Sequence, residues 1–193
     1  ALLSLLKPQD YSSIQNHCPI RDSHSISWYQ GSFIDNQREG SGSIHFHSGF
    51  LFLGTFRDNK RIGEGSFYYK NQVIFEGRFR DDSAITGKIL INNTIDYEGG
   101  FMNGMFSGNS TLRIGDIIYQ GEYKNNCKQG YGYLYSTTNE ELLFEGDFDK
   151  NIPVNLGTVH LNSSLKVLIR FTNEIPSRVI FLQKENQIGE GFF

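Results

Sequence analysis

Residues 52–67 read FLGTFRDNKRIGEGSF. Two aromatic residues flank a glycine, a polar Asp-Asn pair follows, and a Gly-x-Gly-x-hydrophobic segment ends the stretch. The same order recurs along the chain, with the central glycine at positions 31, 54, 77, 99, 121 and 146. The steps between these glycines are 23, 23, 22, 22 and 25 residues, and a fixed period of about 20 to 50 residues is typical of repeat arrays. The sequence therefore predicts a repeat protein.

Each repeat is predicted to form a β-hairpin, because large and polar residues alternate on both sides of a turn. The predicted turns within repeats are Asp35-Asn36, Asp58-Asn59, Asp81-Asp82, Asn103-Gly104, Asn125-Asn126 and Lys150-Asn151. The predicted turns between repeats are Ser48-Gly49, Lys70-Asn71, Asn92-Asn93, Gly115-Asp116 and Thr138-Asn139. Strands and turns at intervals of about 11 residues leave no room for helices. The fold class is therefore all-β, as a meander of antiparallel strands.

The central glycines need a physical reason, since glycine inside a strand weakens it. They share a face with the flanking aromatic residues, so each is expected to leave a slot in which a ring from the neighbouring strand lies flat on the backbone. These structural glycines are Gly31, Gly54, Gly77, Gly99, Gly121 and Gly146. The Gly-x-Gly segment is weakest in the third repeat, which keeps the single glycine Gly87, displaced by one residue relative to the other repeats.

The repeated Tyr-x-Gly-x-Phe and Gly-x-Gly-x-hydrophobic segments resemble the MORN repeat (membrane occupation and recognition nexus). The resemblance implies an elongated, twisted antiparallel sheet built from tandem hairpins of about 23 residues. The array is expected to cover residues 26–193, with about seven repeats and the first strand of an eighth. Residues 1–25 would form an N-terminal extension or cap, with Leu2–Leu6 as the end of a helix. Because the chain begins with Ala1 and ends on a strand, the natural protein is expected to continue.

The formal net charge is −3 at pH 7, which argues against nucleic acid as a partner. The longest basic run is Lys60-Arg61, so no cluster of basic residues is expected. Apolar runs are too short for a transmembrane helix. The cysteines, Cys18 and Cys127, are too few and too distant for a disulfide framework, which favours a cytosolic setting.

Neither a catalytic site nor a cofactor site is expected. His45 and His47 have the spacing of a metal-chelating pair on a strand, but no third ligand accompanies them. The Gly-x-Gly pairs do not open a helix after a strand, as a dinucleotide site requires. We therefore expect no enzyme activity, no cofactor and no bound metal.

The resemblance implies a scaffold that binds other proteins, because similar arrays occur in cytoskeletal, ciliary and membrane-junction assemblies. Some of them hold a partner helix or peptide on the concave face. The candidate partner-binding residues are Tyr29, Phe33, Phe52, Phe56, Phe75, Phe79, Tyr97, Phe101, Tyr119, Tyr123, Phe144 and Phe148. A second interpretation is that most of these rings bury one another and only the outermost contact a partner. The first interpretation predicts that Phe79 and Phe101 can be replaced by alanine without loss of the fold.

Other functions stay open. The name of the repeat family suggests a module that binds phospholipid head groups. Similar arrays are also accessory domains of larger enzymes such as lipid kinases or methyltransferases. Open strand edges at the ends of the array would allow a homodimer. A cytoplasmic location, in association with the cytoskeleton or a cilium, is the expectation that follows from the resemblance.

Overall fold

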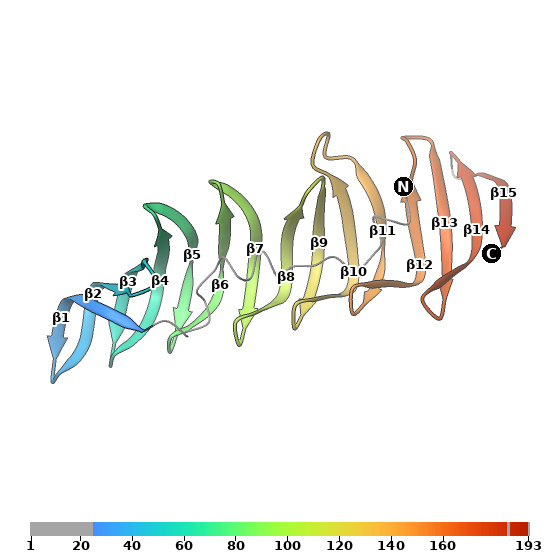
Figure 1. The fold of residues 1–193 in the computed structure, drawn as a ribbon. Coiled ribbons are helices and arrows are strands. Elements are labelled where there is room, and N and C mark those ends of the chain that lie inside the picture. Colours follow the sequence, from blue (N-terminus) through green and yellow to red (C-terminus); the bar gives the residue numbers. More distant parts are fainter. Residues whose placement is uncertain (1–24, 185, 193) are drawn as a thin grey trace. The chain divides into compact units, whose positions relative to one another are not determined.

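The computed structural model describes residues 25–184 and 186–192. All regular elements in these ranges are strands, and no helix occurs in them (Figure 1). The strands are β1 (Ile26–Ile34), β2 (Gln37–Phe46), β3 (Phe50–Arg57), β4 (Lys60–Tyr69), β5 (Gln72–Arg80), β6 (Ser83–Ile91), β7 (Thr94–Met102), β8 (Met105–Ile114), β9 (Ile117–Lys124), β10 (Cys127–Ser136), β11 (Leu142–Asp149), β12 (Ile152–His160), β13 (Leu165–Thr172), β14 (Ile175–Gln183) and β15 (Asn186–Phe192). The proposed cap at residues 1–25 falls, except for Ser25, outside the described residues.

The strands form one open antiparallel sheet in which the spatial order equals the chain order, from β1 to β15. The predicted all-β meander is therefore confirmed. The chain divides into two compact units, and the described residues of the first end at Ser107 whereas those of the second begin at Gly108.

The tight turns lie where the sequence predicts them. Both residues have positive φ in Asp35-Asn36, Asp58-Asn59, Asp81-Asp82, Asn125-Asn126 and Lys150-Asn151, as well as in Lys70-Asn71 and Asn92-Asn93. Two consecutive left-handed residues are the backbone of the hairpin turn that matches strand twist. Asn and Asp tolerate this conformation better than most residues, which explains why these turns can be read from the sequence.

Each central glycine lies opposite the last glycine of a Gly-x-Gly segment on the neighbouring strand. The paired glycines form a line across the strands, which we call the glycine row. In the first unit the row runs Gly31, Gly42, Gly54, Gly65, Gly77, Gly87 and Gly99. In the second unit Gly121, Gly132, Gly146 and Gly157 form the same row. A Cβ atom at Gly54 or Gly65 would lie 2.5 Å from Cζ of Phe52. The glycines therefore make room for rings.

The source of the ring differs from the prediction. Phe52 stands two residues before Gly54 on the same strand, and its ring covers both Gly54 and Gly65 of the next strand. Residues i and i+2 share a face of a strand, so a ring leaning along its own strand reaches the glycine first. Tyr119 covers Gly121 and Gly132 in the same way.

The first glycine of each Gly-x-Gly segment allows a β-bulge. Gly40, Gly63 and Gly130 have φ between 61° and 71° and lie at register shifts in the hairpins. In the sixth repeat Asn155, with φ of 59°, takes this place. The bulges at Gly40, Gly63 and Gly130 leave two residues without a partner on the opposite strand of the hairpin, whereas the bulge of the third repeat leaves one, Ile85, between the paired residues Ala84 and Thr86. This shorter bulge explains why Gly87 is displaced by one place in the sequence.

The aromatic residues form a continuous core within each unit. Phe52 lies edge-on to Phe56 and Phe79, with centroid distances of 5.7 and 5.2 Å. Phe75 makes the same contacts to Phe79 and Phe101, both at 5.7 Å. Edge-to-face pairs of this kind are each worth about 0.5–1.5 kcal/mol beyond the burial of their area. Consecutive repeats are thus joined by rings as well as by strand pairing.

The antiparallel sheet continues after the sixth hairpin. Strands β13 and β14 form the divergent seventh hairpin, in which Ile169 faces Gly157 and Val179 in the glycine row and is buried. Strand β15 pairs with β14 as the first strand of an eighth repeat, and Gly191 faces Val179. The loss of glycine in the seventh repeat goes with the loss of an aromatic ring two residues before it, at Val167.

Candidate functional site

Most of the predicted partner-binding rings are buried. Phe52, Phe56, Phe75, Phe79, Tyr97, Phe101, Tyr119, Tyr123, Phe144 and Phe148 are each at most 6% exposed. Phe33 is 59% exposed, and Tyr29 is half-buried. The interpretation in which most rings bury one another therefore describes these ten side chains. Phe79 and Phe101 are core residues, so their removal is now expected to unfold the hairpins around them.

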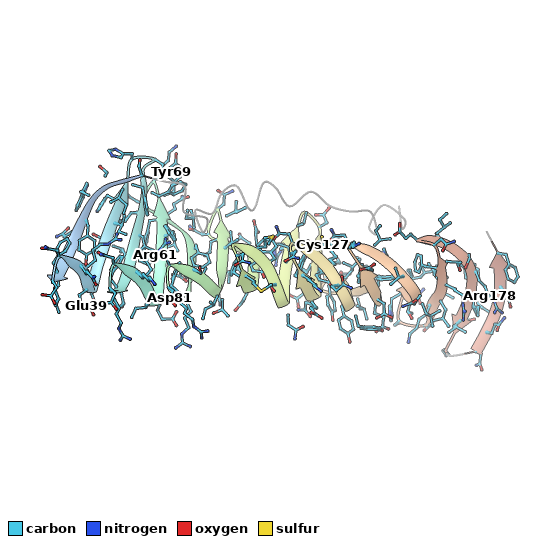
Figure 2. All side chains as sticks on the ribbon, turned by 90° about the horizontal axis from the view of Figure 1, so that it is seen from below. Glu39, Arg61, Tyr69, Asp81, Cys127 and Arg178 are labelled. Atoms are coloured by element: carbon cyan, nitrogen blue, oxygen red, sulfur yellow. The ribbon has the colours of Figure 1, made fainter. Side chains whose placement is uncertain are left out.

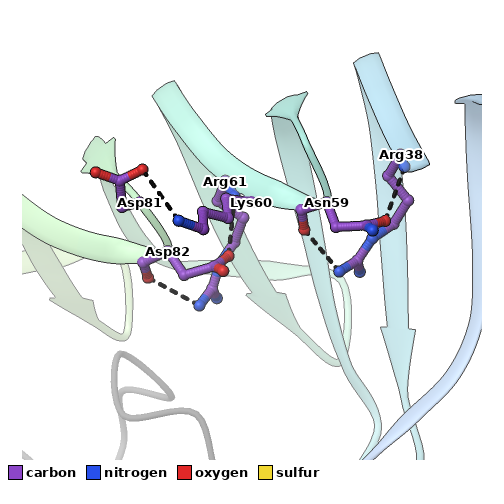
Figure 3. A network of polar contacts seen from close by, with 6 residues as sticks. All are labelled: Arg38, Asn59, Lys60, Arg61, Asp81 and Asp82. Carbon is purple, nitrogen blue, oxygen red and sulfur yellow. Dashed lines mark hydrogen bonds and ion pairs between the residues drawn. The ribbon is translucent and has the colours of Figure 1, made fainter. Parts of the chain in front are cut away.

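A cation at the start of the second strand of a hairpin contacts the turn of the next hairpin. The backbone N–H of Arg61 donates to Oδ1 of Asp82 at 2.9 Å, and Nη2 donates to the Asp82 carbonyl at 2.9 Å (Figure 3). Arg38 makes the corresponding bonds to Asn59, at 2.8 and 2.7 Å. The Arg61 side chain is 2% exposed and lies over the rings of Phe52, Phe67 and Phe79. Both arginines therefore connect one repeat to the next through hydrogen bonds.

Lys128 holds the same position in the second unit. Its backbone N–H donates to Oδ1 of Asn151 at 2.7 Å, and its Nζ lies 5.1 and 5.6 Å from the ring centroids of Tyr119 and Phe148. Burial lowers the pKa of Lys128 from 10.5 to about 8, because the ammonium loses its hydration.

This pKa predicts that the protein becomes more stable as the pH rises. Below pH 8 the lysine is charged in both states and the desolvation cost is complete, whereas between pH 8 and 10.5 the unfolded chain binds more protons than the folded one. The free energy of unfolding should therefore rise by about 2–3 kcal/mol across this window relative to Lys128→Met. Urea unfolding of both proteins from pH 7 to 10 measures the difference. Lys124→Met, which removes an exposed lysine, is the control, and parallel curves for all three proteins would contradict the expectation.

The face opposite the rings carries an exposed cluster that the sequence analysis did not single out. Tyr131, Tyr133 and Tyr135 alternate along β10 with the buried residues Gly132 and Leu134, and their side chains point to the opposite face. Glu145 faces Tyr133 and Asp147 faces Tyr131 on β11. We call these five residues the tyrosine surface. The alternation of tyrosine with glycine and leucine was the signal that could have predicted it.

Charged contacts anchor the tyrosine surface. The hydroxyl of Tyr131 donates to Oε2 of Glu145 at 3.2 Å, and Nε2 of His160 lies 3.1 Å from Oε1 of the same carboxylate. Partial burial raises the pKa of the Tyr131 hydroxyl, and the carboxylates of Glu145 and Asp147 raise it further. The cluster thus combines exposed rings with two neighbouring carboxylates.

The strand register of the first unit gathers basic residues that are far apart in the sequence. Arg57, Lys60, Arg78 and Arg80 line a pocket of ≈ 490 Å³ together with Asp58 and Asp81. Lys60 pairs with Asp81 at 3.6 Å (Figure 3). The expectation that the chain has no basic cluster is therefore wrong. Successive turns lie at the same edge of the sheet, so residues about 23 positions apart become neighbours.

No group of three or more His, Cys, Asp or Glu side chains in the described ranges is placed to hold a metal ion. The ring of His45 stacks on Trp28 at a centroid distance of 3.5 Å, and His47 lies in the turn after β2. Cys127 is a free, half-buried thiol, whereas Cys18 lies outside the described residues. Across the part of the chain that the structure describes, no helix is long and apolar enough to span a bilayer.

Together these features define a tandem β-hairpin repeat protein. A family model described as the MORN repeat matches residues 29–49, 52–73, 97–109 and 119–140, so the chain carries MORN repeats. The matches omit the third repeat, which has the shortened bulge, and all residues after 140, which include the sixth and seventh hairpins. A comparison with curated proteins finds no match. MORN repeats are commonly non-catalytic modules that contact proteins or membranes.

Proposed function

We propose that this protein is a non-catalytic scaffold that holds a protein partner on the exposed face of its sheet. The tyrosine surface carries this proposal. Tyr131 is 50% exposed and Tyr133 36%, and exposed tyrosines on a rigid framework are favoured anchors of protein interfaces. The buried rings supply the rigidity, because each hairpin is fixed to its neighbours by ring packing and strand pairing.

The proposed setting is a larger cytoplasmic assembly, associated with the cytoskeleton or a cilium. The support for this setting is the resemblance to arrays found in such assemblies. An extended surface made of similar hairpins can contact a long partner over several repeats, which is the usual role of repeat proteins.

Affinity capture from the native source, read out by quantitative mass spectrometry, tests the scaffold function. The baits are the wild-type chain, Tyr131→Ser/Tyr133→Ser, and the control Ile95→Ser/Met102→Ser, which removes comparably exposed apolar side chains from the other unit. We expect a set of proteins retained by the wild type and the control to fall at least tenfold with the tyrosine variant. Equal retention by all three baits would contradict a partner site at the tyrosine surface.

A membrane surface is the second candidate, and the basic pocket favours it. Arg57 and Arg80 form no ion pair with any described residue. Basic side chains near an anionic bilayer contribute about 1 kcal/mol each. Flotation with phosphatidylserine vesicles separates the two functions: salt-sensitive binding of the wild type that is lost in Arg57→Ser/Arg80→Ser would favour the membrane over a protein partner.

A further inference from the structure

The rings of the tyrosine surface are arranged to receive a planar or cationic group. The centroids of Tyr131 and Tyr133 are 5.4 Å apart with an interplanar angle of 73°, and those of Tyr133 and Tyr135 are 6.2 Å apart at 28°. The face of an aromatic ring carries negative potential and attracts a cation within about 6 Å. No described lysine or arginine lies over any of these three rings.

The carboxylates next to the rings are in place before a ligand arrives. Glu145 is held on both oxygens, by Tyr131 and by His160, so ligand binding need not order its side chain. Among the described residues, Asp147 receives only a long contact of 3.4 Å, from the amide of Asn155. These residues therefore leave most of its capacity to accept hydrogen bonds unused.

The outward face of β9 to β12 carries more acidic than basic groups, and Lys166 and Arg170 of β13 lie beside it. The outward positions of β9 to β12 hold the carboxylates of Glu122, Glu145, Asp147 and Asp149, against the ammonium of Lys124 and the imidazole of His160. A partner of complementary charge is cationic, and complementary potentials both steer association and exclude wrong partners.

The chain itself shows what fits such a site. On β14 and β15, the guanidinium of Arg178 lies 2.8 Å from Oε1 of Glu190 and 5.7 Å from the ring centroid of Phe192. Figure 2 marks the position of Arg178 on the sheet. Glu190 holds the same repeat position as Glu145, one residue before the row glycine. Arg178 is placed like Tyr131, diagonal to that carboxylate. In the seventh hairpin the array supplies its own arginine, whereas at the tyrosine surface it supplies rings, carboxylates and the imidazole of His160 but no arginine.

We propose that the tyrosine surface binds an extended peptide segment of a partner protein, with an arginine side chain stacked on Tyr131 and Tyr133 and paired with Glu145 and Asp147. This inference rests on the proposed scaffold function and names the chemistry of the partner. Arginine suits the site better than lysine, because its planar group can stack on a ring and donate to carboxylates at once. An extended segment suits it because alternate side chains would point to the same face.

Fluorescence anisotropy with a labelled nonapeptide of alternating threonine and arginine tests the proposal. The wild-type chain should bind this peptide at least tenfold more tightly than the same peptide with glutamine in place of arginine. Tyr131→Ser/Tyr133→Ser should weaken binding at least tenfold although the net charge is unchanged. Glu145→Gln and Asp147→Asn should each weaken it about threefold or more, and Glu174→Gln, a charge removed from an exposed turn, should not.

Circular dichroism and urea midpoints confirm that each variant is folded, and Asp147→Asn carries the test if Glu145→Gln disturbs His160. Equal binding of the arginine and glutamine peptides, or unchanged binding by the folded tyrosine variant, would overturn the proposal. If natural partners depend on the tyrosines but the arginine peptide does not bind, the cationic ligand is refuted and the scaffold function stands. If the peptide binds through the tyrosines but no natural partner is captured, arginine recognition by the tyrosine surface stands, whereas the scaffold function and its protein partner are refuted.

Discussion

Replacing Phe56 with alanine is expected to lower the free energy of unfolding by about 3–5 kcal/mol, because it empties a fully enclosed site. Phe56 is 1% exposed. Its ring lies edge-on to Tyr29 at 5.2 Å and to Phe52 at 5.7 Å, and the guanidinium of Arg38 lies 5.4 Å from its centroid. The loss therefore affects contacts between the first and second repeats as well as those within the second.

Urea unfolding followed by fluorescence measures this effect near the mutation, since Trp28 on β1 is the single tryptophan of the chain. In a repeat array each unit contacts mainly its neighbours, so the tryptophan signal should change at lower urea than the far-UV circular dichroism. Coincident shifts of both signals would show that the whole array unfolds cooperatively and not repeat by repeat.

Phe33→Ala is the matched control, because Phe33 stands two residues after its row glycine exactly as Phe56 does. Phe33 is 59% exposed, and no described residue of an earlier repeat covers its ring. Its removal should cost less than about 1 kcal/mol. Similar losses for the two variants would mean that ring burial does not hold the repeats together.

Replacing Gly77 with alanine is expected to cost more than about 3 kcal/mol, at the upper end of what an overpacked site costs. The new Cβ would collide with the backbone carbonyl oxygen of Thr86 and would lie 2.5 Å from Cζ of Phe75 and 2.9 Å from Cα of Gly87. A backbone atom cannot turn aside as a side chain can, so β5 and β6 must separate locally.

Gly189→Ala is the control for this experiment. A Cβ at Gly189 would meet Cδ2 of Phe181 at 3.6 Å, which is an ordinary contact. The urea midpoint should therefore change little. A Gly77→Ala protein as stable as wild type would disprove the explanation that the glycines are needed because aromatic rings and the neighbouring strand leave no room for a Cβ atom.

Much of the fold could be predicted because its determinants are local. The Asp-Asn and Asn-Asn pairs mark turns through their tolerance of positive φ, and the row glycines mark positions without space for a side chain. Even the displaced Gly87 had a local cause, the missing residue in the bulge of the third repeat. The direction in which Phe52 leans could not be predicted, because strand alternation places it on the same face whichever glycine it covers.

The candidate site was less accessible to prediction. The twelve aromatic residues were recognised by their period, but burial separates Phe33 from Phe56 although the two stand at equivalent positions. The basic pocket was missed because Arg57 and Arg80 are 23 residues apart, one full repeat. The tyrosine surface was missed because Tyr131 and Tyr133 occupy the variable positions of the Gly-x-Gly-x-hydrophobic segment. The motif is defined by the residues of the opposite, buried face.

The sequence by itself determined the period, the turns and the pairing of successive strands, since these depend on residues within one hairpin. Tertiary structure decided which rings are enclosed and which basic side chains contact the turn of the next hairpin. It also decided which side chains stay exposed to a partner. The reason is that burial at any position depends on the hairpin before and the hairpin after it. Neighbouring repeats with the same motif can therefore present different surfaces.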